Sequence, residues 1–280
     1  MPSAPATGIS VLIRTFNSGK TLEEVLAALP LVEGDEFVVV DSGSTDATLA
    51  IASRRGARVI QPAGPFNYSK SLNLGFAAAR NPWVLVLSSH CIPASAGMLG
   101  LLRQTASEAA APVAVIYGET GLCKPRGAAA APDYIDQARW ERNRPQAAGN
   151  GLALYRRTCW AEHPFAEDLV TAEDLEWFLW AMRRGYRALR VPQAWALYRN
   201  QGSLRHMFRK GWFEVINAAT LVNAQGPDLS QAEHFRNLLI NAGSLVNKVL
   251  LGRIPPGTCL RQMAHALGAY LASARSAKRG

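Results

Sequence analysis

Short apolar runs alternate with stretches of helical spacing between residues 9 and 118 of the chain. Each run is rich in Val, Ile or Leu and has the length of a buried strand, whereas the stretches between them place apolar residues on one face. The runs lie at residues 9–14, 36–41, 58–61, 83–88 and 113–118. One helix is predicted from Thr45 to Gly56, and another from Tyr68 to just before Pro82. This alternation predicts an α/β fold with a mainly parallel central sheet flanked by helices.

The regular alternation ends after Gly118. Residues 127–132 read as a loop, and a helix-rich block is predicted from Tyr134. We expect one domain over residues 1–200 and a basic helical C-terminal extension over residues 201–280. From Ala232 onward, apolar residues recur at steps of three and four, which predicts a helix with one apolar face. These residues are Phe235, Leu239, Ala242, Val246 and Val249.

The net charge of +9 is concentrated at the end of the chain. Residues 199–280 contain 11 Lys and Arg against 3 Asp and Glu, so they carry +8 of the excess. Such a segment meets an anionic partner, or it keeps the protein soluble. Nucleic acid is not expected as that partner, because no recognised reading motif accompanies the basic residues. The default explanation of the C-terminal helix is that its apolar face docks on the domain that precedes it. An anionic membrane surface is the sharper alternative, since a basic helix with an apolar face can lie on one.

The cysteines and the hydropathy of the sequence indicate the cellular compartment in which the protein is expected. The four cysteines, at positions 91, 123, 159 and 259, lie far apart without a CxxC pair, which predicts neither a zinc ribbon nor a disulfide framework and fits a reducing cytosol. The first eight residues lack the basic start and the apolar stretch of a secretory signal. No window approaches the roughly 20 apolar residues that a spanning helix needs. We expect a cytoplasmic protein, soluble or peripheral on the inner face of the cell membrane.

The stretch VVVDSGSTDAT at residues 38–48 joins a predicted strand to a helix through a turn of small residues. Asp41 ends the apolar run, so its carboxylate is expected at the carboxyl edge of the sheet, exposed to a ligand. There it would accept a hydrogen bond from the N–H of a base or from a ribose hydroxyl. Ser44, Thr45 and Asp46 also suit a helix N-cap, so a structural and a functional interpretation of Asp46 both stay open.

Four segments, in order, resemble the inverting glycosyltransferases of family 2, which bind nucleotide sugars on a GT-A fold. The segments are ISVLIRTFN from Ile9, VVVDSGSTDAT from Val38, FNYSKSLNLGFAAARNPWVLVLSSHC from Phe66 and FAEDLVTAEDLEWFLWAMRRGY from Phe165. The resemblance covers about residues 9–200, and the FNY stretch before Asn73 is most similar to the rhamnosyltransferase branch. It implies a Rossmann-like GT-A fold and transfer of a sugar from a nucleotide, in polysaccharide biosynthesis for the cell envelope.

The resemblance also implies a nucleotide-sugar site. The acid of the second strand, Asp41, would contact the base or the ribose. The other residues placed near the donor are Thr15, Asn17, Asp46, Lys70, Asn73, Ser89 and His90. Uracil, thymine and guanine all carry an N–H that Asp41 can bind, so UDP, dTDP and GDP sugars stay open as donors. The branch favours dTDP-rhamnose.

Two adjacent acids, Glu173 and Asp174, open the helix of the last segment. An inverting transfer is one displacement, so a carboxylate must take the proton of the acceptor hydroxyl as it attacks the anomeric carbon. By resemblance that base is Asp174, with Glu173 in support or as the alternative. Acids at a helix start also complement the helix dipole, which is the competing structural interpretation. On the same helix, Trp177 would stack on an acceptor sugar or belong to the core.

The sequence departs from the family pattern where an Asp-x-Asp motif usually holds Mg or Mn on the diphosphate. Here the chain reads Ser88, Ser89, His90, Cys91, without a carboxylate. Mg prefers carboxylate and phosphate oxygens, so the sequence of this segment argues against a tightly bound metal. His90 would serve as a ligand for Mn or as a hydrogen-bond donor to the diphosphate. Tyr198 stands where family members commonly place a further His ligand.

A basic cluster follows the acceptor-side segment and offers another way to neutralise the diphosphate. Cations of this kind can clamp a leaving diphosphate electrostatically. The cluster comprises Arg199, Arg205, Arg209 and Lys210. We therefore expect weak or absent metal dependence.

Three functional classes are considered. The first is an enzyme that moves a sugar from a nucleotide donor to a glycan or lipid-linked acceptor. The second is a catalytically silent nucleotide- or glycan-binding module with the same fold, against which the retention of Asp174 argues. The third is another nucleotide-using α/β enzyme, which the turn after Arg14 disfavours because TFNSGK lacks the glycines of a dinucleotide site and is not a P-loop.

Overall fold

The structure is a computed structural model. It describes residues 8–109, 112–123, 130–143, 145–169, 171–199, 203–205, 207–209, 211–212, 248–251 and 254–276. The chain divides into two compact units, of which the first comprises Met1–Leu169 and Glu173–Arg199 and the second Val170–Ala172 and Asn200–Gly280. The sheet belongs to the first unit.

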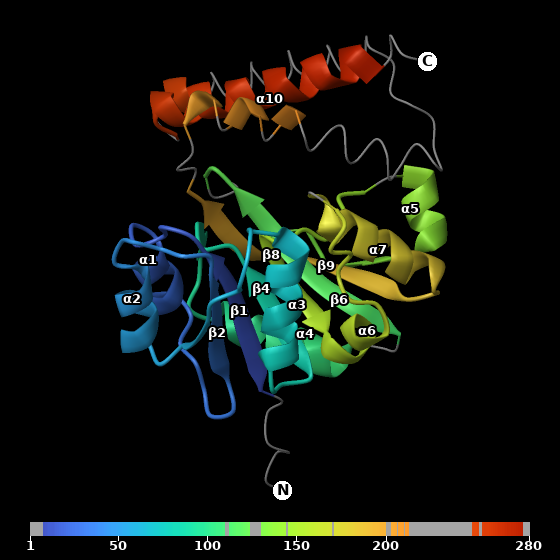
Figure 1. Cartoon of the computed structure of the whole chain (residues 1–280). Coiled ribbons are helices and arrows are strands. Elements are labelled where there is room, and N and C mark those ends of the chain that lie inside the picture. The colour runs from blue at the N-terminus through green and yellow to red at the C-terminus, as the bar shows by residue number, and fades with distance from the viewer. Residues whose placement is uncertain are drawn as a thin grey trace, which may run out of the picture. The chain divides into compact units, whose positions relative to one another are not determined.

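A sheet of nine strands runs through the described part of the first unit (Figure 1). Its strands are β1 (Ile9–Thr15), β2 (Glu36–Asp41), β3 (Arg58–Ile60), β4 (Trp83–Leu87), β5 (Cys91–Pro93), β6 (Val113–Gly121), β7 (Asp133–Ile135), β8 (Leu152–Arg156) and β9 (Arg187–Tyr198). The order across the sheet is β3-β2-β1-β4-β8-β6-β9-β5, and β7 pairs with β9. The five runs predicted as strands are β1, β2, β3, β4 and β6, which confirms them with small differences at their ends.

The sheet has a parallel half and a largely antiparallel half. Strands β3, β2, β1 and β4 run parallel to one another. Strand β8 is antiparallel to β4 and β6, and β9 pairs parallel with β6 but antiparallel with β5 and β7. The parallel order predicted from the sequence thus holds for the first four strands and for the pair of β6 with β9. The block predicted as helix-rich from Tyr134 also contains most of β7 and all of β8 and β9, because these strands mix polar and apolar residues rather than forming plain apolar runs.

Helices cover both faces of the sheet, which confirms the predicted α/β fold. One face carries α1 (Leu22–Ala27), α2 (Thr48–Arg54) and α4 (Met98–Glu108). The other carries α3 (Tyr68–Ala78), α5 (Gln137–Asn143), α6 (Arg157–Glu162) and α7 (Glu173–Arg183). The helix predicted from Thr45 begins at Thr48 instead. Helix α3 begins at Tyr68 as predicted, and the side chain of Asn67 caps it by accepting the Lys70 N–H at 2.8 Å.

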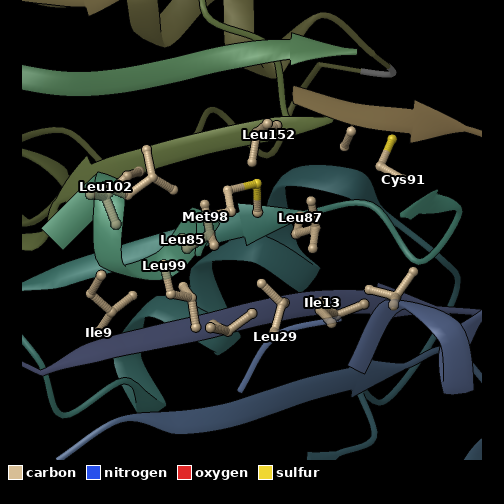
Figure 2. Packing of buried hydrophobic residues seen from close by; sticks show 14 of the residues in the cluster. Ile9, Ile13, Leu29, Leu85, Leu87, Cys91, Met98, Leu99, Leu102 and Leu152 are labelled. Carbon is tan, nitrogen blue, oxygen red and sulfur yellow. The ribbon is translucent and has the colours of Figure 1, made fainter. Parts of the chain in front are cut away.

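The alternation of side chains along β1 divides the core into two layers. Ile9 and Ile13 point into the layer under α1 and α4, whereas Leu12 points into the layer under α3 and α7. Figure 2 shows the first layer, in which Met98 and Leu99 of α4 approach the strands. The apolar side chains on both faces of β1 are therefore buried, and each face contributes to one layer of the core.

Gly75 lets α3 lie directly on β1. A Cβ at this position would stand 2.2 Å from Leu12 Cδ1, closer than real atoms approach. The missing side chain brings the start of α3 to the end of β1, where Arg14 Nη1 donates a hydrogen bond to the Tyr68 carbonyl at 3.0 Å. This close packing fixes one border of the candidate site.

The described part of the second unit is helical. Its main element is α10 (Pro256–Ser276). Most of the apolar helix predicted from Ala232, and the whole of residues 213–247, lie outside the described residues. None of the helices that the structure describes is both long enough and apolar enough to cross a membrane.

Candidate functional site

The carboxylate of Asp41 lies at the carboxyl end of β2, as predicted, but it is completely buried. Its Oδ1 accepts the N–H groups of Gly43 (3.0 Å) and Ser44 (2.8 Å), and its Oδ2 accepts the hydroxyls of Thr15 (2.7 Å) and Ser44 (2.6 Å). The expectation that Asp41 is exposed to a ligand is therefore wrong. The turn after the strand folds back because Gly43 has φ +91°, and this brings its N–H groups onto the carboxylate.

The loops after β1 and β2 are tied together by the other residues predicted near the donor. Asn17, with φ +48°, donates its N–H to Ser44 Oγ (2.8 Å) and accepts the Thr45 N–H at its Oδ1 (2.9 Å). Asp46 accepts the N–H groups of Gly19 (2.9 Å) and Thr48 (3.0 Å), and the Thr48 hydroxyl bond holds the pKa of Asp46 below its usual value. These contacts give Asn17 and Asp46 a structural role, and their part in donor binding stays a prediction.

The segment after β4, predicted to face the diphosphate, is anchored to the loop after β1. Ser89 Oγ lies 2.9 Å from Ser18 Oγ, and the Ser89 carbonyl accepts the Thr21 hydroxyl at 2.7 Å. The His90 ring lies edge-on to the Tyr198 ring, with the centroids 4.9 Å apart. Tyr198, which stands in place of a further His ligand, thus packs on the remaining candidate ligand.

The donor set of this segment does not fit a tightly held divalent cation. Among the residues that the structure describes, no three His, Cys, Asp or Glu side chains come together in a way that could hold a metal. Ser88 Oγ donates to the Asn150 carbonyl at 3.2 Å, and Cys91 is buried in β5. Mg and Mn sites rest on carboxylate oxygens, and the dependence of this protein on a metal stays a prediction.

The acid pair at the start of α7 forms a polar cluster with Arg14 of β1 and with Asn150 in the turn before β8. Glu173 is buried, and its Oε1 accepts hydrogen bonds from Arg14 Nη1 and Asn150 Nδ2, both at 3.1 Å. Asp174 is half-buried; its Oδ2 accepts the Asn150 N–H at 3.1 Å and its Oδ1 the Leu175 N–H at 2.9 Å. The two acids therefore differ in surroundings, since Arg14 binds Glu173 and no cation among the described residues binds Asp174 directly.

The surroundings of Asp174 favour its protonated form. Loss of water around the carboxylate is the main cause, and the neighbouring Glu173 charge adds to it, so that together they raise the pKa of Asp174 to about 6. The two backbone N–H groups and the more distant Arg14 act in the opposite direction and limit the rise. A carboxylate with a pKa near 6 is ionised at neutral pH and still accepts a proton readily, which suits a general base.

The residue directly before the pair is held in an unusual conformation. Ala172 has φ +69°, a left-handed backbone geometry that costs a residue with a Cβ about 1 kcal/mol. Strained backbone residues of this kind cluster at functional sites, and the residue that follows Ala172 is Glu173 of the acid pair.

The side chains of three residues predicted for the site form hydrogen bonds with other groups of the protein. All of the hydrogen-bonding atoms of the Asn73 amide fasten the 160–167 segment to α3, through Trp160, Phe165 and Glu167. Lys70 Nζ donates to the Ala63 carbonyl at 3.1 Å. Trp177 is fully buried, and its indole N–H donates to the His163 carbonyl at 2.8 Å.

The burial of Trp177 contradicts its predicted stacking on an acceptor sugar. The helix places this position against the core, where the indole packs with Tyr155 at a centroid distance of 4.9 Å and with Trp180 at 5.6 Å. Trp177 instead belongs to the core, which was the alternative interpretation from the sequence. No face of this ring is available to a substrate.

The basic cluster predicted as a diphosphate clamp is divided between the two units. Arg199, at the end of the first unit, lies 3.5 Å from Glu24 in an exposed ion pair, and its N–H donates to the His90 carbonyl at 2.8 Å. Arg205 is exposed in the second unit, and Lys210 lies outside the described residues. The clamp stays a prediction.

Sequence reasoning missed Arg14, Asn150 and Tyr155. Arg14 lies 159 residues from Glu173 in the chain, and Asn150 lies in the turn before β8. Tyr155 is completely buried in β8 and donates its hydroxyl to Asn150 Oδ1 at 2.9 Å. The signal that could have identified Arg14 is its position, since a cation that directly follows an apolar strand lies at the same sheet edge as the ligand-facing acids.

Comparison with known families covers the part of the chain that forms this sheet edge. The sequence model described as glycosyl transferase family 2 matches residues 10–162, which is more than half of the chain and includes Arg14, Asp41 and Asn150. The chain belongs to glycosyl transferase family 2. Its matching curated relatives include an uncharacterized glycosyltransferase of Mycobacterium bovis, 36% identical over 81 residues that make up 29% of this chain and 36% of that protein. The aligned part thus spans about a third of the relative's length.

Solved structures share the fold of this family 2 protein. Glucosyl-3-phosphoglycerate synthase of Mycobacterium tuberculosis superposes with a TM-score of 0.59 at 21% identity, over 78% of this chain and 79% of that one. A mannosyltransferase of Pyrobaculum calidifontis in complex with GDP-mannose and Mn²⁺ superposes with a TM-score of 0.63 at 18% identity, over 96% and 86%. At these identities the likeness concerns the fold alone.

Proposed function

We propose that this family 2 protein is an inverting glycosyltransferase in which Asp174 is the general base. The acceptor oxygen attacks the anomeric carbon of the donor, the bond from that carbon to the phosphate oxygen breaks, and its electron pair leaves with the nucleoside diphosphate. The proton of the acceptor hydroxyl passes to the Asp174 carboxylate. The observation that carries the proposal is this half-buried carboxylate, set beside a buried anion and raised in pKa to about 6.

The donor is proposed to lie across the carboxyl end of β1. Adjacent residues on a strand point to opposite faces, so Thr15 reaches Asp41 on one side while Arg14 reaches Glu173 on the other. We place the nucleoside on the Asp41 side, against the loops that follow β1 and β2, and the hexose on the side of the acids. Structural neighbours bind UDP-glucose or GDP-mannose, and we propose a UDP, dTDP or GDP hexose here.

Turnover is expected without added metal. The donor set around His90 does not fit a hard cation, so the leaving diphosphate would be neutralised by a protein cation, for which Arg199 of the first unit is the candidate. A panel of UDP, dTDP and GDP hexoses, followed by NMR of the sugar product, tests this and the proposed function together. We expect one donor to react with inversion at the anomeric carbon and to lose less than about twofold of its rate in EDTA.

Three outcomes of this panel would contradict different parts of the proposal. Retention of configuration would exclude the single displacement. A large loss of rate in EDTA that Mn²⁺ restores would overturn the metal argument alone. Binding of a donor without any reaction would support the silent-module alternative.

A lipid-linked or glycan acceptor at an anionic membrane is the proposed setting. Leu260, Leu267 and Leu271 of α10 are exposed by 56%, 44% and 39%, and their spacing of seven and four residues places them on one stripe of the helix. The same end of the chain carries most of the excess positive charge. Apolar residues with nearby cations are typical of helices that lie at a membrane surface.

Liposome flotation tests the membrane proposal. We expect the protein to float with vesicles that contain phosphatidylglycerol at low salt, and to float at least about tenfold less when Leu260, Leu267 and Leu271 are all changed to Ser. Val32→Ser, at an apolar position of the first unit that is 50% exposed, is the matched control and should float like the unchanged protein. A protein that stays with the unbound fraction at low salt would contradict the proposal.

A further inference from the structure

Asn150 is the single residue that binds both acids of the pair among the described residues. Its backbone N–H donates to Asp174 Oδ2 and its side-chain Nδ2 donates to Glu173 Oε1, each at 3.1 Å. Asn150 is itself buried, with 6% of its surface exposed, so these bonds do not compete with bulk water.

A hydrogen bond from Tyr155 fixes the orientation of the Asn150 side-chain amide. Tyr155 donates its hydroxyl to Asn150 Oδ1 at 2.9 Å, which leaves the Nδ2 end of the amide turned toward Glu173. Tyr155 is completely buried, and loss of water around its hydroxyl together with the Asp174 and Glu173 charges raises the pKa of Tyr155 well above its usual value. The phenol therefore keeps its proton and acts as a permanent donor.

We infer that Asn150 is a positioning residue that decides which of the two acids takes the acceptor proton, by holding Glu173 as the fixed anion and Asp174 as the free base. This inference rests on the proposed function. Glu173 receives two side-chain donors, Arg14 and Asn150, on one oxygen, whereas Asp174 receives only backbone N–H groups. Donors of this kind stabilise the charged form of the acid that they bind.

The groups that face Asp174 come from three elements. Arg14 is the last residue but one of β1, Tyr155 lies in β8, and Glu173 precedes Asp174 on α7. Arg14 lowers the proton affinity of Asp174 and Glu173 raises it, and Glu173 has the greater influence of the two. Because Glu173 acts on its neighbour only while it is charged, Asn150 sets the basicity of Asp174 through Glu173.

The test compares Asn150→Ala, Asn150→Asp and Tyr155→Phe with the unchanged enzyme in the pH dependence of kcat. Asn150→Ala keeps the backbone N–H that Asp174 accepts and removes only the side-chain amide that binds Glu173. Glu173 then competes with Asp174 for the acceptor proton, so the two acids together bind this proton at higher pH. We expect the acid limb to move up by about one pH unit for Asn150→Ala, further for Asn150→Asp, and in the same direction by less for Tyr155→Phe. For Asn150→Ala, a shift of about one unit from a pKa of about 6 should lower kcat at pH 7 about twofold and at pH 5 about tenfold, while both KM values change less than about twofold.

Asn81→Ala is the matched control. It removes a comparable amide bond, from Asn81 Nδ2 to the Gly34 carbonyl at 3.0 Å, on a residue outside the site. We expect an unchanged acid limb for this variant. An acid limb that is the same in Asn150→Ala and in the unchanged enzyme, with thermal unfolding showing both folded, would overturn the inference and leave Asn150 a merely structural residue.

Carboxyl ¹³C NMR separates a failure of this inference from a failure of the proposed function, because it needs no turnover. The two signals are assigned by their loss in Asp174→Asn and Glu173→Gln. In the unchanged protein we expect the Asp174 signal to titrate near pH 6, and in Asn150→Ala we expect the midpoint of this titration to move. Identical titrations in the two proteins would refute the positioning role even if transfer is observed. The expected titrations in a protein that transfers no sugar would leave the positioning role standing and refute the proposed function.

Discussion

Asp174→Asn is expected to lower kcat about 10³-fold, the range for loss of a general base. The amide keeps the shape of the side chain but cannot take the acceptor proton, so the attacking oxygen would have to lose it to water. Donor binding should change less than about twofold, because the proposed contacts to the nucleoside lie on the Asp41 side of β1. Steady-state transfer and donor titration by calorimetry measure the two effects.

The control for this substitution is Asp168→Asn, which makes the same chemical change at an exposed position. It should leave kcat and donor affinity unchanged. A loss of less than about tenfold in Asp174→Asn, with its fold intact, would remove Asp174 from the role of base and direct attention to Glu173.

The same variant has a stability signature that needs no substrate. Because the pKa of Asp174 is raised in the folded protein, the folded state binds its proton more tightly than the unfolded chain. The stabilisation is fully present below the unfolded pKa near 4 and is lost as pH rises through about 6. The unchanged protein should therefore gain stability relative to Asp174→Asn when the pH is lowered from 7 to 5.

Asp41→Ala is expected to lower the free energy of unfolding by about 3 kcal/mol and to weaken donor binding at least about tenfold. The carboxylate accepts four hydrogen bonds, and its removal leaves the buried Thr15 hydroxyl and the N–H groups of Gly43 and Ser44 without their acceptor. The turn that this carboxylate holds would then lose its conformation beside the proposed nucleoside position. Urea unfolding and donor titration measure the two effects.

Asp136→Ala is the control for this second prediction. Asp136 is exposed and accepts the Arg139 N–H at 2.8 Å, so its removal costs a helix cap, about 1 kcal/mol, away from the site. Donor affinity should stay the same in this variant. If Asp41→Ala were no more destabilising than Asp136→Ala and bound the donor equally well, the hydrogen bonds at Asp41 would carry neither role.

The elements that could be predicted are those whose pattern is local. Strands β1, β2 and β4 are apolar runs buried on both faces, and α3 has a visible start at Asn67 and an end before Pro82. Strand β9 could not be predicted in the same way, because Pro192 and polar residues interrupt its apolar positions and its pairing with β6 shifts register twice. Its length is decided by the partners on both sides rather than by its own sequence.

The site was predictable in outline and not in its contacts. The acids of the pair stood out as neighbours at a helix start, whereas Arg14 joins them across 159 residues of chain. Asp41 was placed at the correct edge, but its burial follows from the backbone of a turn whose fold depends on Gly43. Trp177 belonged to the core because the helix packs on Tyr155, a partner that the spacing of the sequence does not identify.

The central claim is that the Asp174 carboxylate removes the acceptor proton in a single displacement. Rapid-quench measurement of one turnover, with enzyme in excess over the donor found in the panel, tests it most directly because neither product release nor donor binding limits the rate. We predict that the single-turnover rate falls about 10³-fold in Asp174→Asn and is unchanged in Asp168→Asn. Equal single-turnover rates in Asp174→Asn and the unchanged enzyme would contradict the account.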